Sequence, residues 1–167
     1  MYEAYIQKAV KTGAAHAKAF TIDQIVFDPR TILKCMWGCE DFGRLHTCPS
    51  APKSLKIEEY IRVFRHYKSG IIVHCHDKTP CQKISYELER QAFLDGFYFA
   101  FSLSDCSICA ECKGLTGQPC AAPKRARPAF HSVGIDVFAT VKALGLPLYP
   151  LKSEGEEQNW YSAVFIE

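Results

Sequence analysis

Residues 105–123 read DCSICAECKGLTGQPCAAP, and the rest of the chain is organised around this stretch. It contains four cysteines in fifteen residues, here called the four-cysteine set: Cys106, Cys109, Cys112 and Cys120. Two successive two-residue gaps let a loop wrap one corner of an iron–sulfur cube, and bacterial ferredoxins open in the same way. The last gap is seven residues, long enough for the loop to return to the same cluster, and two glycines ease that return. The spacing therefore predicts one [4Fe–4S] cluster on this set.

Zinc is the competing metal for the same four thiols. Structural zinc sites usually pair two short-gap knuckles across a longer separation. Three thiols on one continuous short loop suit a distributed cluster better than a single tetrahedral ion. Burial of the thiols as small apolar groups, with no metal bound, does not explain their spacing. The basic residues that follow, Lys124, Arg125 and Arg127, form either a solvated turn or a docking surface for an acidic redox partner.

A second group of thiols lies upstream, in residues 35–49, which read CMWGCEDFGRLHTCP. We call it the three-cysteine set: Cys35, Cys39 and Cys48. Three thiols can hold three irons of a cube, which leaves the fourth iron open or bound by a distant residue. An open iron binds a substrate as a Lewis acid. The sequence thus predicts a second cluster here, with two alternatives: a zinc ion completed by a histidine or cysteine, and no metal.

The fourth position beside the three-cysteine set decides between a closed and an open site. If residues 71–76 form a strand, Cys75 faces the opposite side from its two histidine neighbours, so these residues cannot all serve one site. Cys81 falls in the first turn of a predicted helix, where the pKa of a thiol is lowered. Five candidates for a fourth ligand are within reach: His46, His74, Cys75, His76 and Cys81. For the last four of these, a purely structural role is favoured over that of a ligand.

The whole chain has the composition of one folded domain over residues 1–167, with 48% hydrophobic and 23% charged residues. Its net charge of +2 is too small to indicate nucleic acid. No apolar stretch approaches the roughly 18 residues of a membrane span. Residues 1–5 lack the basic start and apolar run of a secretion signal, so we expect a cytoplasmic protein. In the cytoplasm, clustered cysteines more often bind metal or do redox chemistry than form disulfides. Seven of the nine cysteines in this chain are clustered in this way.

Apolar spacing and turn residues predict an α/β fold: a single domain of about five strands alternating with helices, with the metal loops at strand ends. Ser54 and Thr79 are the expected caps of the second and third helices. The predicted helices span residues 2–20, 55–68, 79–96 and 129–144. The predicted strands span residues 21–28, 71–76, 97–103, 146–151 and 160–166.

With both cysteine sets in view, the chain resembles an uncharacterised "predicted metal-binding protein" family, a domain of unknown function in anaerobic bacteria and archaea. The resemblance covers most of the chain and departs from the family pattern at Ser50, where a double proline is usual, and at Phe42, where tyrosine is common. Neither departure removes a thiol. The resemblance implies metal binding at the seven cysteines and supplies no reaction. Its motifs are residues 35–49 with Phe42-Gly43, the four-cysteine set with Pro123, Arg127-Pro128 and residues 133–137.

Three functions are compatible with these patterns. The first is a two-cluster electron carrier that serves redox protein partners. The second is an enzyme whose open iron binds a small-molecule substrate or sulfide in a pocket rimmed by Asp41, Arg44 and His46. The third is a zinc-stabilised binding module. The sequence contains no phosphate-binding glycine loop and no Gly-x-Ser-x-Gly elbow, and it assigns no catalytic residue.

Overall fold

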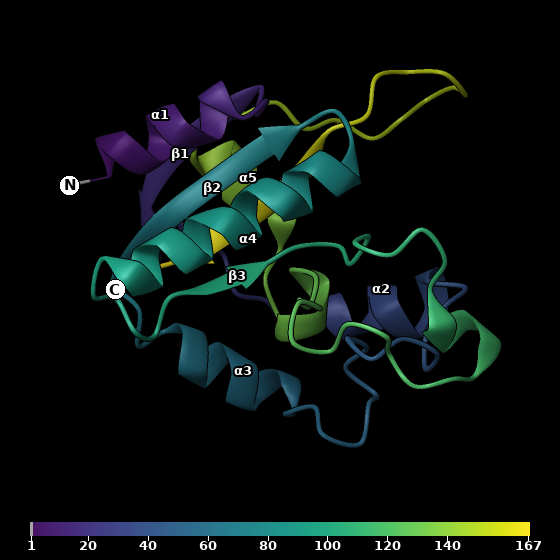
Figure 1. The fold of residues 1–167 in the computed structure, drawn as a ribbon. Helices are drawn as coiled ribbons and strands as arrows, with labels where there is room; N and C mark the ends of the chain where they lie inside the picture. Colours follow the sequence, from purple (N-terminus) through teal and green to yellow (C-terminus); the bar gives the residue numbers. More distant parts are fainter. Residues whose placement is uncertain (1) are drawn as a thin grey trace.

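A four-stranded antiparallel sheet forms the centre of the structure, a computed structural model that describes residues 2–167 (Figure 1). The strand order is β1-β2-β4-β3. The strands are β1 (His16–Thr21), β2 (Ser69–Cys75), β3 (Phe101–Leu103) and β4 (Trp160–Phe165). The helices are α1 (Glu3–Lys11), α2 (Thr31–Gly38), α3 (Ile57–Phe64), α4 (Lys78–Leu94) and α5 (Val137–Ala143). Three short 3-10 turns join them: η1 (Ile22–Gln24), η2 (Lys113–Thr116) and η3 (His131–Val133).

Alternate side chains of the central strand β2 pack on opposite faces of the sheet, as the two-residue period of a strand requires. Ile71, Val73 and Cys75 join the apolar cluster under α1 and α4. Ile72 joins the other cluster, which α3, η3 and α5 cover. His74 stacks on Tyr161 at a ring-centroid distance of 4.7 Å. The α/β fold class is confirmed, and the sheet has four strands where the sequence predicted about five.

The predicted helix over residues 2–20 is wrong beyond residue 11. Gly13, with a φ of 111°, turns the chain, and residues 16–21 then pair with β2. Phe20 lies in β1 and is 2% exposed. It matched the apolar spacing of a helix because a residue buried on a sheet is as apolar as one buried on a helix. The predicted strand over residues 21–28 contains η1 and a single bridge from Phe27.

Three further element boundaries differ from those predicted. The strand predicted over residues 146–151 is absent, and this proline-containing segment runs irregularly. The strand over 97–103 is shortened to β3, because residues 97–100 form turns after α4. The helix over 129–144 is divided into η3 and α5 at Gly134, whose φ is 84°. Asp136 then caps α5 by accepting a hydrogen bond from the backbone N–H of Ala139.

The cap of α4 is Asp77 and not Thr79, because the Asp77 carboxylate accepts a 2.9 Å hydrogen bond from the Thr79 backbone N–H. α3 likewise starts after Lys56, whose N–H donates to Glu59, so Ser54 is not its cap. In residues 2–167, no helix has both the length and the apolar character needed to cross a membrane.

Two long connections carry the cysteine sets. The three-cysteine set begins in the last turns of α2 and continues into the segment before α3, and the four-cysteine set follows β3. The green loop after β3 lies beside α2 in Figure 1, at the same edge of the molecule. The four-cysteine loop thus begins at the end of β3, a strand end, as expected, whereas the three-cysteine loop begins on a helix.

Candidate metal centre

The two cysteine-bearing loops contact each other through Arg44. Its Nη1 lies 3.1 Å from the Asp41 carboxylate within its own loop. Its Nη2 donates to the carbonyl oxygen of Leu115 in the other loop. Beside this contact, a Cβ added to Gly114 would lie 2.7 Å from the carbonyl oxygen of Arg44 and 3.6 Å from the Cys112 sulfur. Glycine is therefore needed for so close an approach of the two backbones.

The three-cysteine set lines a cavity of about 340 Å³. Cys48 is buried, Cys35 is half-buried and Cys39 is exposed, so the three thiols differ in their access to solvent. The Cys48 thiol donates a hydrogen bond to the carbonyl oxygen of Asp41 at 3.6 Å, and this contact holds the Cys48 side chain in place.

The four-cysteine set lines an adjoining cavity of about 490 Å³. All four of its thiols are half-buried. The two cavities share a wall, which is built from Cys39, Leu45, Thr47, Asp105 and Cys106. One thiol of each set therefore belongs to both cavities.

Asp105 is a polar group of the site that the sequence did not single out. It is half-buried, directly precedes Cys106 and lines both cavities. Burial raises the pKa of its carboxyl, and the charges of His131 and Lys78 lower it in part. His131 is a second unpredicted polar group on the wall of the three-cysteine cavity. The signal in the sequence was only the position of Asp105 at the end of a strand, next to a cysteine.

Burial favours the neutral form of two of the seven thiols, Cys35 and Cys106. Burial is the largest cause that raises the pKa of Cys35, and a hydrogen bond with Ser132 opposes it. Burial likewise raises the pKa of Cys106. Metal ligands must be deprotonated thiolates, so loading either cavity with a metal would release protons.

The donor set fits a thiolate-bound metal or cluster in number and type. All nine cysteines are free thiols, seven of them line the two cavities, and the close approach at Gly114 keeps the loops together. Within residues 2–167, however, no three Cys, His, Asp or Glu side chains already converge as a group that could hold one metal ion. The loops thus place the seven thiols on the cavity walls.

The residues predicted as a fourth ligand are mostly directed elsewhere. Cys75 and Cys81 lie together in the apolar cluster under α4, and neither lines a cysteine cavity. The lowered pKa expected for Cys81 is wrong: its hydrogen bond with Cys75 and its burial raise the pKa well above the ordinary value. His74 is fully buried and hydrogen bonds to His16 and Asn159.

The remaining predicted polar groups are divided between the cavities. His76 contacts Gln158 and Glu157, and it lines neither cysteine cavity. His46 and Asp41 line the four-cysteine cavity, although they were expected at the rim of the other one. Arg44 lines neither and joins the loops instead.

The basic stretch after the four-cysteine set contains two exposed cations, not three. Lys124 and Arg125 are exposed. Arg127 is buried and forms an ion pair with Glu89 of α4. A docking surface there would consequently use only the first two side chains.

A protein-family model matches most of the chain. The model of the family described as "Predicted metal-binding protein (DUF2284)" matches residues 18–166, a range that contains both cysteine sets. This confirms the resemblance drawn from the sequence. Comparisons with curated proteins and with solved structures found no match.

Proposed function

Because the chain belongs to this predicted metal-binding protein family, we propose that it binds two iron–sulfur clusters and transfers electrons. The four-cysteine set would hold one [4Fe–4S] cluster and the three-cysteine set a second. The observation that carries the proposal is the shared wall, which places one thiol of each set, Cys39 and Cys106, between two adjoining cavities. Two cofactors held by one wall are close enough to exchange electrons, and a single structural zinc ion would need only one of these cavities.

A bound [4Fe–4S] cluster supplies a redox couple whose potential depends on hydrogen bonds to sulfur and on solvent exposure. The protein's own residues would set both quantities. Buried Cys48 and the half-buried thiols would keep water from most of each cluster, and exposed Cys39 would give one route to a partner. The exposed pair Lys124 and Arg125 would favour an acidic redox protein in the cytoplasm.

A second function, catalysis at an open iron, is favoured by one specific observation. The fourth thiol on the wall of the three-cysteine cavity, Cys106, belongs to the other set, and Asp105 and His131 also lie on this wall. A carboxyl group whose pKa is raised by burial can exchange protons with a bound small molecule. Under this proposal the two residues would bind and orient a small substrate beside the cluster.

Anaerobic purification followed by iron and acid-labile sulfide analysis tests the main proposal. We expect about eight irons and about eight sulfides per chain, because two [4Fe–4S] clusters require them. About four of each would remove one cluster from the proposal. A colourless protein with zinc and no sulfide would overturn it and support the zinc-stabilised module.

Cyanide titration of the reduced protein, followed by electron paramagnetic resonance, tests the open-iron function. We expect one cluster signal to shift and the other to stay unchanged, because only the three-cysteine cluster lacks a fourth thiolate. In an Asp105→Ala variant the shift should need more cyanide, since the substitution removes the carboxyl group that this proposal places beside the bound molecule. A response of both signals, or of neither, would argue against an open site.

A further inference from the structure

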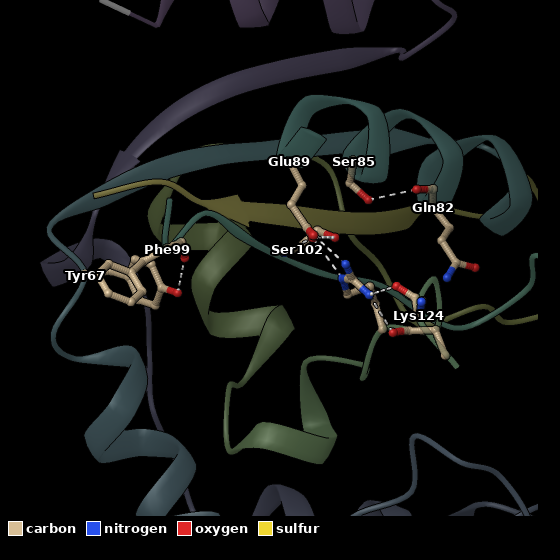
Figure 2. A network of polar contacts seen from close by, with 9 residues as sticks. Tyr67, Gln82, Ser85, Glu89, Phe99, Ser102 and Lys124 are labelled. Carbon is tan, nitrogen blue, oxygen red and sulfur yellow. Dashed lines mark hydrogen bonds and ion pairs between the residues drawn. The ribbon is translucent and has the colours of Figure 1, made fainter. Parts of the chain in front are cut away.

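Gln82 is a polar side chain buried completely between α4 and the four-cysteine loop, with an exposed fraction of 0%. Its amide oxygen accepts hydrogen bonds from the backbone N–H of Ser107, at 2.5 Å, and from the Ser107 hydroxyl, at 3.3 Å. Figure 2 shows the Gln82 amide extending away from the helix, whereas Ser85 contacts only the Gln82 backbone. The residue after the first ligand of the set is thereby anchored to α4.

The amide nitrogen of Gln82 has no conventional hydrogen-bond partner among residues 2–167. A buried amide N–H without a partner is costly, so such a group usually has a function or an unseen partner. The Gln82 oxygen is bound to Ser107, the residue directly after Cys106, so the amide lies next to the Cys106 segment. A hydrogen bond of the Gln82 side chain also lowers the pKa of the Cys106 thiol, against the larger raising effect of burial. The backbone N–H groups of Arg127 and Ile108 also act on this sulfur.

These contacts give Cys106 a different environment from that of the other thiols of its set. The Gln82 side chain and the backbone of Arg127 and Ile108 each lower the pKa of this thiol, and the Gln82 amide nitrogen has no other partner among residues 2–167. A neutral thiol gains little from several donors, whereas a thiolate that carries cluster charge gains much more. Hydrogen bonds to the sulfurs stabilise the added electron and so raise the potential of a cluster.

We propose that Gln82 is a positioning residue of the four-cysteine site: it anchors the loop through Ser107 and donates an N–H···S hydrogen bond to the Cys106 thiolate, which raises the reduction potential of the bound cluster. This inference rests on the proposed iron–sulfur function. It assigns a role to a residue of α4 that lies 24 positions before its target in the sequence.

Redox titrations of Gln82→Glu and Gln82→Met, monitored by electron paramagnetic resonance, test this proposal. Gln82→Glu keeps an oxygen acceptor for Ser107 and removes the N–H donor, and Gln82→Met keeps the volume and removes both contacts. In each variant we expect reduction of the four-cysteine cluster to become about tenfold less favourable, a negative shift of about 59 mV for a one-electron couple. The potential of the other cluster should not change. Ser85→Ala is the matched control, because Ser85 lies one turn away and contacts only the Gln82 carbonyl.

The outcomes separate this inference from the function on which it rests. Wild-type protein without iron and sulfide would overturn the proposed function. Wild-type protein with both clusters, and variants with unchanged potentials, would overturn the role of Gln82 alone. If the Gln82→Met variant does not bind a cluster at the four-cysteine site, the reduction potential of the Gln82→Glu variant tests the role of Gln82. If neither variant binds a cluster at the four-cysteine site, loss of the four-cysteine cluster alone supports the anchoring role of Gln82. Equal loss of both clusters contradicts that role.

Discussion

Cys112→Ser is expected to halve the iron content, to about four irons per chain, and to leave one cluster signal intact. Cys112 lines only the four-cysteine cavity. A serine hydroxyl is a hard oxygen that stays protonated, and it replaces a soft thiolate poorly as a ligand to an iron–sulfur cluster. Iron and sulfide analysis with electron paramagnetic resonance measures both parts of this result.

The reciprocal variant, Cys48→Ser, should remove the other cluster, because Cys48 lines only the three-cysteine cavity. Substitution at the shared wall should behave differently. Cys39→Ser and Cys106→Ser are each expected to remove one cluster and to alter the signal of the one that remains, since their side chains face both cavities.

Cys75→Ala provides the control, because Cys75 is as buried as a ligand thiol but packs under α4, away from both cavities. Its iron content should equal that of the wild type. Loss of all iron from Cys112→Ser, or normal iron in both Cys112→Ser and Cys48→Ser, would show that the two sets are not independent cluster sites.

The cysteine sets could be predicted from the sequence because their spacing is local. A gap of two or seven residues limits where a loop can go, whatever the fold around it. The partners of the loops were not predicted, because they depend on contacts between distant segments. The place of Asp105 in the site became clear only from the wall that the two cavities share. The role of Gln82 became clear only from the contact of α4 with the loop that begins 24 residues later.

The errors in the fold have a similar origin. Residues 16–21 have an apolar pattern compatible with both helix and strand, and pairing with β2 selected the strand. The lowered pKa expected for Cys81 assumed that position in a helix sets the pKa of a thiol. Burial beside Cys75 has the opposite effect and is stronger. The sequence also suggested an exposed role for Arg127, whose partner Glu89 lies 38 residues away.

The ion pair of Glu89 and Arg127 is the basis of the second large expected effect. The two side chains are only 13% and 10% exposed. Arg127 donates through Nε and Nη2 to the carboxylate, and its Nη1 donates to the carbonyl oxygens of Lys124 and Ala126. The carboxylate also accepts the N–H and hydroxyl of Ser102, as Figure 2 shows. The network ties α4 and β3 to the segment that follows the four-cysteine set.

Glu89→Gln is expected to destabilise the protein by about 3–5 kcal/mol, because it leaves the Arg127 charge buried without a counter-charge. Arg127→Met should cost a similar amount, since the Glu89 carboxylate then remains unpaired. With a slope of about 2 kcal/mol per molar urea, the unfolding midpoint falls by roughly 1.5–2.5 M. Urea unfolding followed by circular dichroism under anaerobic conditions measures the shift.

The double variant Glu89→Gln with Arg127→Met separates the ion pair from the packing around it. Glutamine still accepts from Ser102, and methionine fills the space beside the rings of Tyr86 and Phe101, over which the guanidinium lies at 5.1 Å from each ring centroid. No buried charge remains, so the double variant should cost clearly less than the sum of the two single variants.

Arg90→Met is the matched control for this network, because Arg90 pairs with Glu87 on the same helix at 3.4 Å with both side chains more than half exposed. An exposed pair of this kind contributes below about 1 kcal/mol. Single variants at Glu89 and Arg127 that cost no more than Arg90→Met, or costs that simply add in the double variant, would contradict the expected coupling. A large coupling would instead identify this ion pair as the contact that keeps the end of the four-cysteine loop on α4, the helix whose Gln82 binds Ser107 of the same loop.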